Sequence, residues 1–100
     1  MAGLVLSDAS PLIALSRVAG LPWLQHLFGT VWMPPEVWAE VVTGRGLPGE
    51  AALVEALASG WLRVTEPAPQ SPELPDLDEG EAACIRFALA HEGSTLIADG

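Results

Sequence analysis

The 100-residue sequence contains no lysine and no tyrosine, only four arginines, and a single cysteine. The shortage of basic residues excludes binding of nucleic acid through a broad basic patch, because that affinity comes largely from Lys and Arg replacing counterions. One cysteine excludes an internal disulfide, and the lack of a Cys/His cluster excludes a structural zinc site. No stretch approaches the ~18 apolar residues of a membrane span, and the short apolar start has no basic leader. We therefore expect a protein of the cytoplasm that is neither exported nor inserted in a membrane.

Hydrophobic residues, by contrast, make up 50% of the sequence, and charged residues make up 17%. This composition is typical of a folded chain, and the length predicts a single domain covering residues 1–100. Thirteen acidic residues give a net charge of −9. Any role with nucleic acid must therefore depend on a local site.

Strand and helix signals alternate along the sequence. Strands are expected at residues 4–6, 31–33, 61–65 and 95–98, and helices at 10–18, 21–28, 34–42, 50–59 and 79–91. Ser10 is the expected N-cap of the first helix, with Pro11 at its first position. The alternation predicts an α/β fold, a three-layer α/β/α sandwich with a mostly parallel central sheet. The sequence stops directly after the fourth strand, and we expect a further helix and strand to be missing.

Two aspartates follow predicted strands, where ligands of parallel sheets bind. Asp8 comes after the first strand, and Asp99 comes after the fourth. Ordinary alternatives exist for both: Asp8 can be a helix cap or turn residue, although Ser10 already takes the expected cap position, and Asp99 can be a turn residue before glycine. The position of the two carboxylates favours a shared edge of the sheet.

Three glutamates lie on predicted helices that pack against this sheet. Glu36 and Glu40 are four residues apart, and the apolar arc of their helix predicts that Glu40 reaches a cleft while Glu36 is solvated. Glu81 lies in the apolar stripe of the last helix. Asp78 and Glu81 also have the spacing of a capping box, which remains an equal alternative for Glu81.

These acids, Asp8, Glu40, Glu81 and Asp99, can meet at one end of such a fold. Two like charges ~4 Å apart repel by about 4 kcal/mol at an effective dielectric of ~20, so a cluster needs protons or a cation. Ligands that are all oxygen select a hard ion such as Mg²⁺ or Mn²⁺. Metal ions held in this way assist phosphodiester cleavage.

Four segments of the sequence resemble, in order, the motifs of PIN-domain nucleases, and most closely the small prokaryotic branch related to the VapC toxins of toxin–antitoxin pairs. They are VLSDASPLIAL (5–15), PPEVWAEV (34–41), DEGEAACI (78–85) and LIAD (96–99). The resemblance implies that Asp8, Glu40, Glu81 and Asp99 bind the metal, with Ser10 as a polar group beside the first acid. It also implies Mg²⁺- or Mn²⁺-dependent cleavage of single-stranded RNA, dimerisation, and inhibition by an antitoxin protein.

Two other functions remain open at this point. One is a catalytically silent interaction module that keeps the PIN fold. The other is a receiver-like signalling domain with a phosphorylated aspartate, which is disfavoured because Thr65 stands where the third strand would place the phosphoacceptor.

The tryptophans are expected in the core or in a dimer interface rather than as platforms for bases. A homodimer is expected from apolar helix surface at five positions, Trp23, Leu24, Leu27, Trp38 and Val54. Arg45, in a glycine-rich loop, is the arginine best placed for a phosphate contact.

Overall fold

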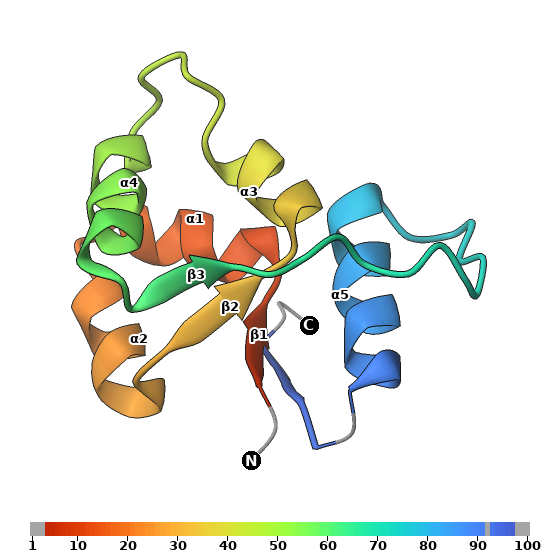
Figure 1. The fold of residues 1–100 in the computed structure, drawn as a ribbon. Coiled ribbons are helices and arrows are strands. Elements are labelled where there is room, and N and C mark those ends of the chain that lie inside the picture. The colour runs from red at the N-terminus through yellow and green to blue at the C-terminus, as the bar shows by residue number, and fades with distance from the viewer. Residues whose placement is uncertain (1–3, 92, 98–100) are drawn as a thin grey trace.

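Four short strands form one parallel sheet in the order β3-β2-β1-β4 (Figure 1). The structure, a computed structural model, describes residues 4–91 and 93–97. The strands are β1 (Val5–Ser7), β2 (Val31–Met33), β3 (Leu62–Val64) and β4 (Thr95–Ile97). The helices are α1 (Ala9–Arg17), α2 (Leu21–Phe28), α3 (Pro35–Val41), α4 (Glu50–Ser59) and α5 (Glu79–Ala90). The predicted α/β class with a parallel sheet is confirmed.

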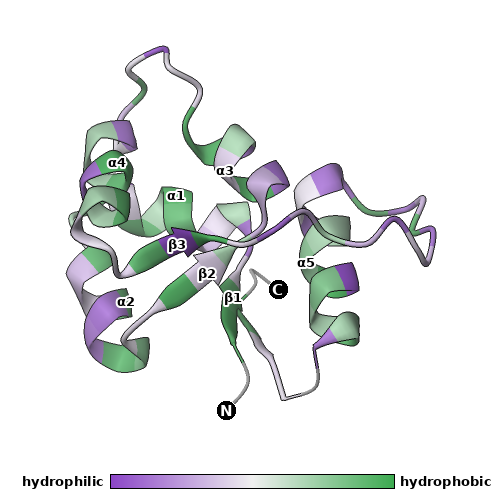
Figure 2. Ribbon diagram, viewed as in Figure 1, coloured by the Kyte–Doolittle hydropathy of each residue, from purple (hydrophilic) through white to green (hydrophobic). Residues whose placement is uncertain are grey.

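Alternate strand residues serve two separate cores, one on each face of the sheet. Val31 and Met33 are fully buried in the larger cluster, beneath α1, α2 and α4. Trp32, between them, packs on the opposite face with the smaller cluster, which includes Phe87 of α5. Figure 1 shows α5 on the side away from α1, α2 and α4, and Figure 2 shows hydrophobic residues on the helices of both layers. The chain therefore forms three layers, as expected.

The parallel sheet brings the carboxyl ends of all its strands to one edge. β1 leads there directly into α1, and β2 leads through Pro34 into α3. α3 crosses this edge and packs against both α1 and α5, which joins the two helical layers. The edge therefore carries the residues that follow β1 and β2 together with the N-terminal turn of α5.

The element boundaries agree with the sequence except near the first helix and at strand ends. α2, β2 and α4 match the prediction, whereas the first strand lies at Val5–Ser7 and α1 begins at Ala9. The expected cap at Ser10 is wrong, because Ser10 is already helical and exposed. Pro11 fits within the first turn, where the backbone N–H groups have no intrahelical partner.

The argument that used Thr65 changes with the topology. Thr65 follows β3, which is an edge strand of the sheet. In a receiver-like doubly wound sheet the third strand lies in the centre. The end of β3 is therefore not the position of a central phosphoacceptor, whatever residue it holds.

The apolar surface differs in part from the expected one. Trp23 and Leu27 of α2 are 73% and 71% exposed, and Val54 is also exposed, as expected. Leu24 is buried and Trp38 packs against the larger core, so their prediction as uncovered surface is wrong. In the part of the chain that the structure describes, no helix is both long enough and apolar enough to cross a membrane.

The glycine-rich loop between α3 and α4 is held by the first residue of α4. The Glu50 carboxylate accepts hydrogen bonds from the Thr43 hydroxyl at 2.6 Å, from the Thr43 N–H at 3.1 Å and from the Gly44 N–H at 3.2 Å. These donors, the Thr43 hydroxyl above all, lower the pKa of Glu50 below its ordinary value of 4.5. Gly49 closes the loop against α1 at a φ of +90°, where a Cβ would lie 2.8 Å from Ser16 Cβ.

The pKa of Glu50 predicts a stability that depends on pH. Because the folded state lowers this pKa, ionised Glu50 stabilises the fold above pH 4.5, and the contribution is lost as pH falls through the folded pKa. Glu50→Gln should therefore melt below the parent at pH 7, and the two should converge under acidic conditions. The exposed Glu55→Gln on the same helix is the control. Equal melting of parent and Glu50→Gln at pH 7 would contradict the role of the loop.

Candidate active site

Asp8 stands at the junction of β1 and α1, on the carboxyl edge of the sheet. Its side chain is the N-cap of α1, with Oδ1 accepting a hydrogen bond from the Ala9 N–H at 2.7 Å. Its own N–H donates to the Ile97 carbonyl of β4 at 3.0 Å, and the residue is only 8% exposed. The prediction that Asp8 is not needed as a cap is therefore wrong. A capping carboxylate keeps further lone pairs, so the cap does not prevent a second role.

Glu40 reaches this edge from α3 and lies against the first turn of α5. A Cβ placed on Gly80 would be 2.9 Å from the Glu40 Cδ and closer still to Oε1, so a larger residue at this position would displace the Glu40 carboxylate from its present place. Although Glu40 is an exposed residue, partial desolvation of its carboxylate, followed by the charge of Asp78, raises its pKa, and Asp8 and Glu79 add to the effect. The Gly80 N–H opposes it by hydrogen bonding. Glu40 therefore lies among other acids, of which Asp8 is one of the predicted partners and Asp78 and Glu79 are not.

Glu36 differs from its prediction. Instead of being solvated, the side chain is partly buried, and its Oε1 is buried with no hydrogen-bond partner among the described residues. The cause is the packing of α3 against both α1 and α5, which covers more of this short helix than its apolar arc indicates. A buried carboxylate oxygen without a partner is costly, so this atom is a candidate ligand for a cation.

The pKa of Cys84, a residue of α5, is affected by the charges around this edge. The thiol is fully buried and its Sγ lies 3.5 Å from the Ser7 carbonyl, to which it donates. Its pKa is raised to about 12, by burial above all and then by the charges of Asp8, Glu40, Glu36 and Asp78 in that order. Four carboxylates from three separate segments thus act on one buried atom. The expectation of Cys84 as a small buried side chain is confirmed.

Glu81 takes part in the predicted cap at the start of α5. The Asp78 side chain accepts a hydrogen bond from the Glu81 N–H at 2.8 Å, which is one half of a capping box. The Glu81 side chain is partly buried, and it is not among the main charges acting on Glu40 or Cys84. Its role beside Asp8 stays a prediction.

The two remaining predicted residues, Ser10 and Asp99, do not extend the described site. Asp99 lies outside the described residues, and Ser10 is an exposed residue in the first turn of α1.

The acids that approach one another suit a hard cation in their chemistry. All donors are carboxylate oxygens, Glu36 offers an oxygen without a partner, and the pKa of Glu40 is raised by neighbouring anions. Over residues 4–91 and 93–97, however, no three His, Cys, Asp or Glu side chains stand close enough together to hold an ion. The donor set therefore fits Mg²⁺ or Mn²⁺ in kind, without forming a complete coordination sphere.

Sequence reasoning missed Glu36 and Asp78 as members of this acidic group. Glu36 is one helical turn before Glu40, which was a signal that both can face the same neighbour. Asp78 was considered only as a cap, yet a residue that caps α5 must lie where α5 begins, beside Glu40.

Comparison with protein families identifies the family of this chain. A family described as "PIN domain" matches residues 4–100, and the chain therefore belongs to the PIN-domain family. PIN domains are in general nucleases and typically depend on divalent metal ions, which indicates a nuclease-type function here. Neither a search of curated proteins nor a search of solved structures found a match.

Because the pKa of Glu40 is raised, its contribution to the stability of the fold depends on pH in the opposite direction from that of Glu50. Since the folded state raises this pKa, the stability associated with Glu40 is full below pH 4.5 and is lost as pH rises through the folded value. In EDTA at pH 7, Glu40→Gln should melt above the parent, and the difference should disappear in acid. Glu66→Gln, at an exposed position, is the control for the general effect of removing one negative charge. A Glu40→Gln variant that melts below both proteins at pH 7 would show that the carboxylate is not under repulsion.

Proposed function

We propose that this PIN domain is a metal-dependent endoribonuclease that cleaves single-stranded RNA. The observation that carries the proposal is that the charges of Asp8, Glu40 and Glu36 all act on the buried Cys84 at the carboxyl edge of a parallel sheet. The neighbouring anions Asp78 and Asp8 help to raise the pKa of Glu40, and a cation bound beside it would keep this carboxylate ionised at neutral pH. An RNA substrate supplies phosphodiesters, whose cleavage divalent metal ions assist.

In this proposal the acids provide the oxygen ligands of the metal ion. Asp8 and Glu40 hold the ion, joined by Asp99 and Glu81 as the resemblance of their motifs implies, and Glu36 provides an additional oxygen. A bound Mg²⁺ or Mn²⁺ supplies a hydroxide near neutral pH and stabilises charge on the phosphate. Asp8 is held firmly by the cap at Ala9, which gives its carboxylate a defined orientation. Ser10, an exposed residue in the first turn of α1, is available to contact the substrate.

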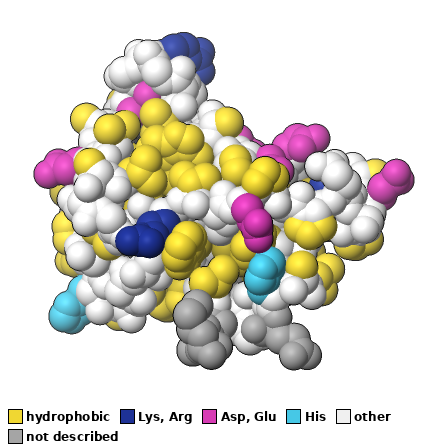
Figure 3. All heavy atoms as spheres, in the orientation of Figure 1, with side chains coloured by type: hydrophobic (Ala, Val, Ile, Leu, Met, Phe, Trp, Pro, Cys, Tyr) yellow, Lys and Arg dark blue, Asp and Glu magenta, His cyan; other side chains and the backbone are white. Residues whose placement is uncertain are grey.

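The acidic surface restricts how RNA can bind. Figure 3 shows Asp and Glu side chains between α3 and α5 and along the segment before α5, whereas few Arg side chains appear on this face. With a net charge of −9, the protein gains little from the phosphate backbone in general. Recognition therefore depends on the ion and on a few local contacts, among which Arg45 in the loop held by Glu50 is available.

The biological role that fits best is the toxin component of a toxin–antitoxin pair, with an antitoxin protein as the partner. This part of the proposal rests on the resemblance of the four motifs to the VapC-like branch. The alternative is a catalytically silent PIN-fold module. It is favoured by the lack of a three-residue metal group in the described part of the chain. No observation favours the receiver-like alternative, because β3 is an edge strand.

Removing the charge of one proposed metal ligand, Asp8, tests the proposed nuclease function. Asp8→Asn keeps the shape of the side chain and one oxygen but removes a unit of charge, so it should weaken ion binding. We expect a loss of more than about 100-fold in cleavage of single-stranded RNA with Mg²⁺ or Mn²⁺, since even outer partners of metal ligands cost about 10–100-fold. Without metal, the variant should melt no lower than the parent, as one anion of a repelling group is gone.

The parent in excess EDTA and the exposed-site variant Glu55→Gln are the controls. Full activity of the parent in EDTA, or of Asp8→Asn with metal, would contradict a metal nuclease. A parent that cleaves nothing with either ion would favour the silent module.

The second element of the proposal is a homodimer through the exposed face of α2. Trp23 and Leu27 are one helical turn apart and both more than two-thirds exposed, with Val18 nearby in the chain at 73%. Polar replacement at exposed positions costs the folded monomer little, so it acts on association.

Light scattering at micromolar concentration should give a dimer for the parent and a monomer for the double variant Trp23→Ser/Leu27→Ser. Leu89→Ser on α5, at a site 67% exposed, should remain dimeric. The association should strengthen with salt, because each copy carries a charge of −9. A monomeric parent would remove this element of the proposal and leave the nuclease untouched.

A further inference from the structure

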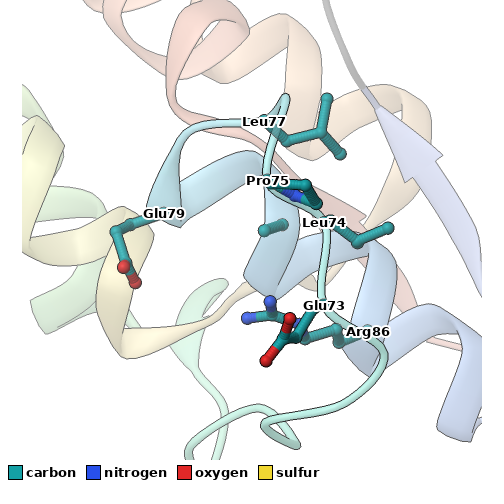
Figure 4. Close-up of a pocket in the computed structure, with 7 residues that line it drawn as sticks. Glu73, Leu74, Pro75, Leu77, Glu79 and Arg86 are labelled. Carbon is teal, nitrogen blue, oxygen red and sulfur yellow. The ribbon is translucent and has the colours of Figure 1, made fainter.

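A pocket of about 330 Å³ lies between α5 and the proline-rich segment that precedes it. Four apolar residues contribute to its walls, Leu74, Pro75, Leu77 and Ala82, and the segment is turned back on itself by a hydrogen bond from the Leu77 N–H to the Leu74 carbonyl at 3.1 Å. In the view of Figure 4, Glu73 and Arg86 lie at one end of this pocket, Leu77 at the opposite end, and Glu79 apart from them. The pocket has an apolar body with both signs of charge at one end.

Arg86 is fixed in this pocket by a single hydrogen bond. Its Nε donates to the Pro72 carbonyl at 2.6 Å, which leaves the N–H groups of the two terminal nitrogens available. Within the described residues, Arg86 forms no ion pair, so these donors are not used by a neighbouring carboxylate. A guanidinium held in this way is prepared to donate two parallel hydrogen bonds to a planar ligand.

The pocket adjoins the candidate active site through the N-terminal turns of α5. Glu79 and Ala82 line it, while Asp78 and Gly80, on the same turns, act on Glu40. A ligand in the pocket can therefore belong to the same molecule as a phosphate at the acids.

We propose that this pocket binds a guanine base of the RNA substrate, which rests on the proposed ribonuclease function and adds a base preference to it. Guanine presents two adjacent acceptors, O6 and N7, which Arg recognises in a bidentate manner. On the neighbouring edge it presents two donors, N1–H and the N2 amino group, which a carboxylate accepts. The Arg86 and Glu73 pair matches both edges, and the apolar walls match the flat faces of the base.

The other bases match this pair less well. Adenine has a donor where guanine has O6, and neither pyrimidine has two adjacent acceptors on an edge that leaves two donors beside it. Charge also favours a base over a phosphate in this place. Six of the thirteen acidic residues lie between positions 66 and 81, so an anionic group is repelled there while a neutral base is not.

Binding of the four ribonucleoside monophosphates to ¹⁵N-labelled parent protein in EDTA tests the inference. The four carry the same phosphate, so repulsion by the acidic surface cancels from the comparison. GMP should shift the backbone amides of Leu74, Leu77 and Ala82 and bind at least about tenfold more tightly than AMP, CMP or UMP, as one lost bidentate pair is worth ~1–3 kcal/mol.

Two variants separate recognition from folding. Arg86→Gln should lose the preference for GMP, and Glu73→Gln, which keeps the bond between Arg86 and Pro72, should lose it as well. Arg63→Gln, at an exposed arginine of β3, is the matched control and should bind GMP like the parent. Unchanged spectra away from the pocket establish that each variant is folded.

Equal binding of all four nucleotides, or GMP shifts outside the pocket, would overturn the inference. An arginine-rich peptide that shifts the same amides when GMP does not would make the pocket a protein-binding site and overturn it too. The measurement needs neither metal nor cleavage, so its result is separate from that of the nuclease. GMP binding without RNA cleavage supports the pocket alone, and cleavage without GMP binding supports the nuclease alone.

Discussion

The contact on which the candidate site depends is the approach of α5 to α3 at Gly80. No side chain intervenes there, so the first turn of α5 lies against the Glu40 carboxylate and a Cβ would displace it. This contact joins the layer formed by α5 to the layer formed by α1, because α3 packs on both helices. It also brings Asp78, the cap of α5, toward the acids that follow β1 and β2. The acidic group is therefore a product of how three helices meet at one edge of the sheet.

The arrangement places one carboxylate, that of Glu40, under repulsion from its acidic neighbours. The pKa of Glu40 is raised by burial and by neighbouring acids, and the pKa of Cys84 is raised to about 12 by burial and the same acids. Because its pKa is raised, ionised Glu40 raises the free energy of the folded state at neutral pH, which a bound cation would offset. Glu50 is the contrast: its carboxylate is surrounded by donors and organises a loop. The two environments distinguish an acid that holds structure from acids that favour a ligand.

The elements of the fold could be predicted largely from local signals. Glycine and proline mark the ends of α2, β2 and α4, and their predicted boundaries agree with the structure. The start of α1 was mistaken because Asp8, Ser10 and Pro11 all carry helix-start signals, and only the path of the chain from β1 decides which residue caps. The prediction that Glu36 is solvated was wrong for a related reason. A period of 3.6 residues assumes one covered face, whereas α3 is covered on two sides.

By itself, the sequence determined the class of fold, the order of its elements and the positions of acids after strands and on inward helix faces, because these follow from spacing along the chain. It also carried the ordered motifs through which the chain belongs to the PIN-domain family. Only the tertiary structure decided which acids meet, that Glu36 has a buried oxygen without a partner, and that Asp8 serves as the cap of α1. The reason is that burial and Coulomb interactions depend on distances between segments far apart in sequence, which no local pattern contains.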